Sequence, residues 1–248
     1  MATAAVHAKH EKTAYEKWQE TIDEALTDNA WDEYDCDIWR IVAEYNKFLG
    51  GTPGYKPLDW KTVKAMLWTE SGGPSNAAWK SRPMQIGNSG DPGLKALLGG
   101  QEGGSLIIPP SLKSGLTVQI AGADPRMNIR AGVGYLLMRC AKFDQLTTTE
   151  GPVVPYTIKP GDSFDKIARE NGSTPATLQK LNPTAKVLMP KQTISIQKAK
   201  TRTVIVGWEP ITNATIANKY NTRDGRYADK LAYCLTIIER SKRGLQCQ

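Results

Sequence analysis

Histidine is nearly missing from this chain: its 248 residues contain only His7 and His10, both near the start. Zinc peptidases and zinc amidases usually bind their metal through imidazole. Cysteine and serine hydrolases need a histidine beside the nucleophile. The composition therefore argues against all of these classes, and we expect neither a metal nor another cofactor. Any hydrolytic chemistry in the body of the chain must rely on carboxylates.

Long apolar runs are missing as well. The apolar stretches are short and are broken by Lys, Arg or Gly, whereas a membrane-spanning helix needs about 20 consecutive apolar residues. We therefore expect no membrane insertion. The first ten residues, MATAAVHAKH, have neither an apolar core nor a cleavage motif, so no ordinary secretory signal is predicted.

The four cysteines form no CxxC pair, which argues against a zinc ribbon or a thioredoxin motif. Cys140 and Cys234 fall on apolar helical faces, where buried free thiols are expected. Spacing alone leaves a disulfide between these two open.

Acidic residues are scarce in the second part of the chain. Residues 153–248 hold 16 of the 32 Lys and Arg but only 7 of the 25 Asp and Glu. A basic surface suits an anionic polymer such as cell-wall material or nucleic acid, or simply keeps the protein soluble. The basic residues follow no nucleic-acid-binding motif, so no nucleic acid partner is expected.

Apolar spacing and end signals predict a mainly helical chain. Helices are expected over residues 11–26, 31–48, 60–70, 127–143 and 226–242. Asp59 is the expected N-cap of the third helix, which places Glu70 in its last turn. Residues 74–125 are rich in Gly, Pro and Ser and are predicted to form a functional loop, because ordinary loops are shorter. A polar linker is expected over 144–155, and either a strand or a return linker over 201–208.

The segment after this linker resembles the LysM family along its whole length. The matching residues are Tyr156, Pro160-Gly161-Asp162-Ser163, Ile167-Ala168, Leu178, Asn182-Pro183, Pro190 and Ile194-Ser195-Ile196. Alternation and turn residues independently predict a β-α-α-β order.

The LysM resemblance implies that glycans containing N-acetylglucosamine bind between two loops. The implied contacts are Gly161, Asp162, Ser163, Phe164, Met189 and Pro190. Alternatively, Gly161 and Asp162 only form a turn. Lys191 stands where the family usually has glycine.

The remaining helices resemble the lysozyme-like lytic transglycosylases (the soluble transglycosylase and goose-type lysozyme superfamily) in scattered motifs. These are Glu70-Ser71, then Met84-Gln85-Ile86, then Pro125, Asn128, Ile129, Gly132, Tyr135 and Leu136. The expected Tyr-Asn motif follows the LysM segment, as Tyr220-Asn221, with Tyr227 on the next helix. We therefore predict an α+β fold: a mainly α-helical catalytic domain over 1–150 and 201–248, with a LysM domain inserted at 153–198. The alternative is a C-terminal appendage unrelated to catalysis.

Glu70 is the expected catalytic acid. The negative end of its helix dipole and its apolar neighbours both disfavour ionisation, and glycosidic cleavage needs a protonated carboxyl group near neutral pH. The resemblance implies that Tyr220 orients Glu70, and that Ser71, Gln85, Asn128 and Asn221 bind substrate or support the acid. The family pattern is altered at three places, by Gly72-Gly73, Arg82-Pro83 and Lys219. We expect Lys219 to affect contact with the anionic peptide stem of the wall.

Two reaction types fit this site on peptidoglycan. A lytic transglycosylase needs one glutamate to cleave the bond between N-acetylmuramic acid and N-acetylglucosamine, whereas a hydrolytic muramidase usually needs a second carboxylate. The candidates for the second carboxylate are Asp91, Glu102 and Asp124, and none stands out, so the sequence favours the transglycosylase. A protein that binds the wall without catalysis is the third alternative.

The biological setting follows from these expectations. A protein made in the bacterial cytoplasm without a signal peptide must reach the periplasm or cell wall by another route, and we expect this wall to belong to a target cell. This suggests an antibacterial effector of the type VI secretion kind or a phage lytic protein. Its expected partners are peptidoglycan glycan strands, together with an immunity protein or a secretion-machine component.

Overall fold

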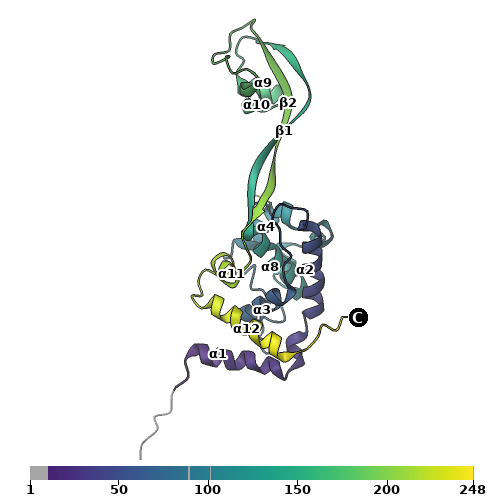
Figure 1. Ribbon diagram of the computed structural model, residues 1–248, viewed down its shortest axis with the longest axis vertical. Helices are drawn as coiled ribbons and strands as arrows, with labels where there is room; N and C mark the ends of the chain where they lie inside the picture. Colours follow the sequence, from purple (N-terminus) through teal and green to yellow (C-terminus); the bar gives the residue numbers. More distant parts are fainter. Residues whose placement is uncertain (1–10, 89, 101, 248) are drawn as a thin grey trace, which may run out of the picture. The chain divides into compact units, whose positions relative to one another are not determined.

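The computed structural model describes residues 11–88, 90–100 and 102–247, so both histidines lie outside the described residues. The chain divides into two compact units (Figure 1). The helical unit comprises the described residues of 1–142 and 206–248, and the strand unit comprises 143–205. The mixed content, about half helix with a two-stranded antiparallel sheet, confirms the α+β class.

The helical unit begins with α1, Ala14–Asp23, which continues into a 3-10 turn at Glu24–Leu26. A second 3-10 turn, Asn29–Asp32, precedes α2, Asp35–Leu49. The helix predicted over 31–48 thus starts later than expected. Its first residues form the 3-10 turn and bury Trp31.

Helix α3, Trp60–Ser71, agrees with its prediction, including the Asp59 cap, whose side chain accepts from the Lys61 amide at 3.0 Å. The helix ends in two glycines with positive φ, 71° at Gly72 and 102° at Gly73. A Cβ on Gly73 would lie 2.5 Å from the Trp31 ring. The Gly-Gly pair after Glu70-Ser71 therefore lets the chain turn directly over Trp31.

The region 74–125 was wrongly predicted to be one long loop. It contains four short helices: α4, Gly93–Gly99; α5, Gly104–Ile107; α6, Pro110–Lys113; and α7, Val118–Ala121. Each is too short to display a helical period between the glycines and prolines that bound it.

Helix α8, Pro125–Cys140, is the central element of the helical unit and buries ten residues distributed around its axis. Two glycines allow neighbours to approach it closely. A Cβ on Gly132 would lie 2.7 Å from Met84, and one on Gly134 would lie 2.5 Å from the Tyr45 hydroxyl. The helix ends three residues before the predicted Phe143, because the chain enters a strand at Ala141.

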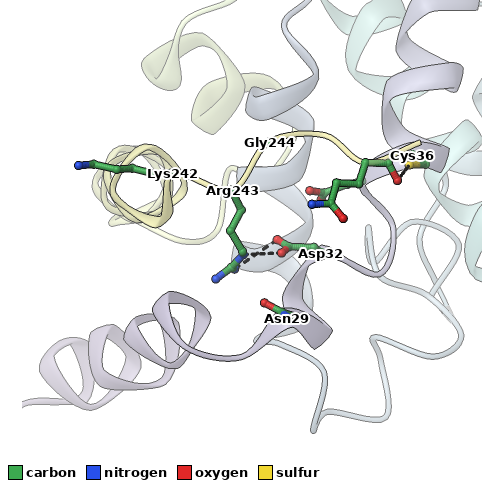
Figure 2. Close-up of a pocket in the computed structure, with 8 residues that line it drawn as sticks. Asn29, Asp32, Cys36, Lys242, Arg243 and Gly244 are labelled. Atoms are coloured by element: carbon green, nitrogen blue, oxygen red, sulfur yellow. Dashed lines mark hydrogen bonds and ion pairs between the residues drawn. The ribbon is translucent and has the colours of Figure 1, made fainter. Parts of the chain in front are cut away.

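The C-terminal part of the helical unit contains α11, Asn213–Lys219, and α12, Tyr227–Ser241, which packs along α3 (Figure 1). After α12 the tail is tied back by a disulfide between Cys36 and Cys247. Arg243 hydrogen-bonds Asp32 beneath this tail (Figure 2). Cys140 and Cys234 are buried free thiols, as expected.

The strand unit is built on two long strands, β1, Ala141–Thr157, and β2, Thr193–Trp208, which pair with each other. Helices α9, Phe164–Glu170, and α10, Pro175–Leu181, lie between them in sequence. The prediction of a polar linker over 144–155 was wrong, because these residues belong to β1. Cross-strand contacts explain the pairing, since Thr147 meets Thr201 at 2.8 Å and Gln145 donates to Thr203 at 3.0 Å.

A small apolar core closes the strand unit around Ile167 and Leu178, both 0% exposed. It also includes Ile158, Ala168, Ala185, Ile194 and Ile196. No helix within the described ranges has both the length and the apolar character that crossing a membrane requires.

Candidate functional site

Glu70 lies in the last turn of α3 and is half-buried. Its Oε1 accepts a 2.7 Å hydrogen bond from the Tyr227 hydroxyl and a 3.4 Å contact from the Asn221 amide. Both donors come from the chain segment that follows the strand unit. The structure therefore brings Glu70 together with residues more than 150 positions away.

Burial is the main influence on the Glu70 carboxyl group and raises its pKa above the usual range. The hydrogen bonds from Tyr227 and Asn221 favour the ionised form and oppose part of this rise. Asp224 adds to the rise through like charge, and Lys230 acts against it. The net effect favours a carboxyl group that still holds its proton at a pH where ordinary glutamates have lost theirs.

The resemblance implies that Tyr220 lies near Glu70 and orients it; within the described residues the tyrosine that hydrogen-bonds Glu70 is Tyr227. The Tyr220 hydroxyl instead donates to the Met84 carbonyl at 2.8 Å, and its ring meets Tyr135 edge to face at 5.6 Å. Glu70 still raises the pKa of Tyr220 electrostatically, after the larger effect of burial. Tyr220 therefore interacts with Glu70 electrostatically, while its hydroxyl holds the Met84 segment through the carbonyl hydrogen bond.

Asn128 and Ser71 were predicted to contact substrate or support the acid, and their side chains hydrogen-bond within the protein. Asn128 is 0% exposed; its amide oxygen accepts from the Met84 amide, and its NH₂ group donates to the Ile86 and Ala121 carbonyls. Ser71 is 1% exposed and donates to the Leu67 carbonyl at 2.6 Å. Burial removes both side chains from a ligand, and their role is to fix the segments on either side of Glu70.

Gln85 is half-buried, and its backbone adopts φ 51°, which non-glycine residues seldom do. Its side-chain amide donates to the Arg82 carbonyl at 3.2 Å and accepts from Asn88 at 2.9 Å. Of the five predicted contact residues, Gln85, Tyr220 and Asn221 are the ones with partly exposed side chains.

The three candidates for a second carboxylate each have a local partner. Asp91 accepts from the amides of Gly87 and Gly93, and Asp124 caps α8. Glu102 is exposed and pairs with Arg139 at 3.7 Å. None of these carboxylates contacts Glu70 among the described residues.

Asp224 is the acidic residue that sequence reasoning missed. It acts electrostatically on Glu70, and its own carboxylate pairs with Lys230 at 2.7 Å. No sequence pattern singles it out, because its position depends on how the 221–226 loop folds back onto α3.

In the strand unit, Gly161 has φ 79°, and Asp162 directs its carboxylate inward. The Asp162 carboxylate accepts from the Tyr156 hydroxyl, the Lys159 amide and the Lys166 amine at 2.8–3.1 Å, and the Asp162 side chain is fully shielded in that ion pair. This supports the alternative that Gly161 and Asp162 serve mainly as a turn.

The other predicted contacts in the strand unit differ in exposure. Ser163 caps α9 by accepting from Lys166, and Phe164 packs against the apolar core. Met189 is 65% exposed and Pro190 is also exposed, so this loop offers the more accessible surface. Lys191 has φ 73°, a conformation that glycine adopts with less strain.

Comparison with known proteins identifies one part of the chain. Residues 156–197 match the family model of the LysM domain. Among curated proteins and solved structures, none matches the chain. The lysozyme-like resemblance of the helical unit gains no support from these comparisons. The chain therefore contains a LysM domain, a peptidoglycan-binding module, at residues 156–197.

Proposed function

We propose that this protein is a peptidoglycan lytic transglycosylase in which Glu70 is the catalytic acid and the LysM domain holds the wall. The observation that carries the proposal is the environment of Glu70: a half-buried carboxyl group with a raised pKa, bound by Tyr227 and Asn221. A raised pKa is the property by which enzymes keep a carboxylic acid protonated as a general acid. The LysM domain makes peptidoglycan the natural substrate.

In this mechanism the protonated Glu70 gives its proton to the glycosidic oxygen between N-acetylmuramic acid and N-acetylglucosamine. The C–O bond breaks, and positive charge develops on the muramic sugar ring. The Glu70 carboxylate, stabilised by the Tyr227 hydroxyl, then accepts the proton of the sugar's own 6-hydroxyl. That oxygen closes a 1,6-anhydro ring, and Glu70 ends protonated as it began.

The hydrogen bonds and ion pairs of the other carboxylates favour the transglycosylase reaction over hydrolysis. A hydrolytic muramidase usually employs a second carboxylate to activate water or stabilise the cation. Asp91 already accepts two backbone amides, and Asp224 is engaged by Lys230. The hydrolytic alternative would require one of these carboxylates to face the sugar ring from the side opposite Glu70.

The test is the Glu70→Gln variant on purified sacculi. Loss of a general acid typically lowers the rate by about 100-fold or more. Glu239→Gln, an exposed change on α12, is the matched control and should retain the wild-type rate. Mass spectrometry of the released fragments separates anhydro ends from reducing ends. Equal rates for Glu70→Gln and wild type would contradict the assignment.

Wall binding without catalysis is the second candidate function, and the LysM match favours it directly. In that case the helical unit serves as a scaffold. Wild-type protein would then sediment with sacculi without releasing soluble muropeptides.

We further propose that the protein acts in the periplasm or cell wall, as an antibacterial effector or a phage lytic protein. The Cys36–Cys247 disulfide supports this setting, because structural disulfides persist mainly in oxidising compartments. Expression in a bacterial host with and without an export leader tests it. Lysis of the producing cell is expected only on export, and equal lysis without export would refute the setting.

A further inference from the structure

We propose that Arg223 and Arg226 form a subsite for the carboxylates of the peptide stems that peptidoglycan carries beside the cleaved bond. This inference rests on the proposed function, since it names a determinant of substrate choice at the same site. It concerns the loop 221–226, which connects α11 to α12.

The loop is attached to the candidate acid at both ends. The Asn221 amide lies 3.4 Å from Glu70 Oε1, and the Tyr227 hydroxyl lies 2.7 Å from the same oxygen. Extended chain spans about 3.5 Å per residue. Arg223 is therefore at most about 7 Å of backbone from Asn221, and Arg226 about 4 Å from Tyr227.

Internal hydrogen bonds hold the loop in one shape. The Asn221 side-chain oxygen accepts from the Arg223 amide at 3.3 Å. The Asp224 carboxylate accepts from the Arg226 amide at 2.9 Å, and the Asp224 carbonyl accepts from the Tyr227 amide at 3.0 Å. A fixed loop presents its side chains to a ligand with little ordering cost.

The two arginines are the cations that this loop leaves for a ligand. Arg223 and Arg226 are exposed. Among the described residues no hydrogen bond or ion pair joins either guanidinium to a carboxylate, although Arg226 acts on Asp224 electrostatically. Lys230 is already paired with Asp224 at 2.7 Å. Lys219, which the sequence suggested for stem contact, is paired with Glu209 at 2.9 Å, so this role passes to the arginines.

Aromatic packing orients Arg226. Its guanidinium lies over the Tyr15 ring, 5.0 Å from the centroid. Tyr15 stacks on Trp18 at 5.6 Å, and the Lys230 amine lies over Trp18 at 5.4 Å. A cation–π contact of this kind does not use the N–H groups of the guanidinium as hydrogen-bond donors, so they remain available to a carboxylate.

The chemistry of the wall supplies the matching ligand. Its glycan backbone is uncharged, whereas the peptide stems on the muramic sugars carry free carboxylates. A general acid that cleaves beside a muramic sugar therefore works next to an anionic stem. Asp229, exposed in the first turn of α12, is an acidic neighbour outside the Asp224–Lys230 pair. It would oppose such binding and provides a control of opposite sign.

The first experiment measures binding without catalysis. The wild-type chain and an Arg223→Ala/Arg226→Ala variant are titrated with a disaccharide tetrapeptide, and then with the same disaccharide whose lactyl carboxyl group is capped as a methylamide in place of the peptide, so that the second ligand carries no carboxylate. We expect the wild type to bind the peptide-bearing ligand about tenfold more tightly, a gain of the size that one good charged contact provides. The double variant should lose this preference, Asp229→Asn should increase it, and Arg240→Ala on the same helix should leave it unchanged. Equal affinities of the wild type for the two ligands would overturn the proposal.

The second experiment measures rates on intact sacculi and on glycan strands stripped of their stems, with the exposed lactyl carboxyl groups of the stripped strands capped as amides. The double variant should be slower on sacculi and unchanged on stripped strands. Equal slowing on both substrates would overturn the proposal, because it would indicate a general effect on the Glu70 loop. Inactivity of the wild type on both substrates would instead refute the proposed function, while the binding titration would still decide the subsite.

Discussion

Replacing Tyr227 with Phe removes one hydroxyl group from a ring that is 1% exposed. That hydroxyl donates to Glu70 Oε1 at 2.7 Å. A hydrogen bond to a charged group contributes about 1.5–3 kcal/mol, and one between neutral groups contributes about 0.5–1.5 kcal/mol. The variant should therefore lose roughly 1 kcal/mol more of its unfolding free energy when Glu70 is ionised than when it is protonated.

The sign of the pH dependence follows from linkage. Loss of the donor disfavours the carboxylate, so the already raised pKa of Glu70 rises further. A carboxyl group whose pKa is raised by folding contributes stability below its unfolded pKa, and this contribution is lost as pH rises through the folded pKa. The difference between wild type and Tyr227→Phe should therefore be smallest in acid and should widen as pH rises through the folded pKa of Glu70, which burial places above the ordinary value of 4.5.

Two measurements check this prediction. Denaturant unfolding over a pH series gives the stability difference. The pH profile of muropeptide release should show its basic limb, where the acid loses its proton, at higher pH in the variant.

Tyr233→Phe is the matched control. Tyr233 lies on α12, like Tyr227, but its hydroxyl donates to Asp23 of α1 at 2.8 Å and does not contact Glu70. It should lower stability and leave the basic limb in place. A stability difference for Tyr227→Phe that stays constant with pH, together with an unmoved limb, would refute the assigned contact.

Two further predictions concern the helical unit. Reduction of the disulfide, or the double change Cys36→Ser and Cys247→Ser, should lower the unfolding free energy by about 2–5 kcal/mol. The reason is that it removes a covalent bond between residues separated by 211 positions. Identical unfolding midpoints with and without reductant would contradict this prediction. Gly132→Ala should cost about 1–3 kcal/mol, since the added Cβ would lie 2.7 Å from Met84. Gly244→Ala, where a Cβ meets no described atom within 4 Å, is its control in thermal unfolding, and equal melting temperatures for the two variants would show that Met84 yields without cost.

Strong local signals made several elements predictable from the sequence. Asp59 before an apolar stripe and Gly72 after it fix α3, because capping and helix termination depend on adjacent residues. The LysM segment combines short strands with two capped helices, at Ser163 and Thr174, within about forty residues. In each case the information lies within one or two turns of the element it determines.

Other features could not be predicted because they depend on distant partners. Most residues of β1 are exposed, so the strand lacks the apolar alternation that marks a half-buried strand. It forms because β2 pairs with it. The Cys36–Cys247 disulfide has no signal in its spacing, since the bond depends on where the tail returns.

The tyrosine that contacts Glu70 shows the same limit at the candidate site. Tyr220 and Tyr227 stand seven residues apart, and the family resemblance favoured the first. Tyr220 ends α11 and faces the Met84 carbonyl, whereas Tyr227 begins α12, which lies along α3. Helix packing, which a linear motif does not encode, decides which hydroxyl reaches the acid.

The insertion of the strand unit is compatible with the Glu70 site because the chain leaves and re-enters the helical unit at adjacent points. The Glu209 amide donates to the Cys140 carbonyl at 2.8 Å, so the two ends are already joined by a hydrogen bond. An insertion between neighbouring ends adds little closure entropy to the unit that receives it. Glu70, however, obtains both of its hydrogen-bond donors from the returning segment. Without that segment, Glu70 would lack both of the donors that its carboxyl group has in this structure. The acidity that the proposed reaction needs therefore belongs to the closed helical unit rather than to α3, and the disulfide at the end of the same segment helps keep the unit closed.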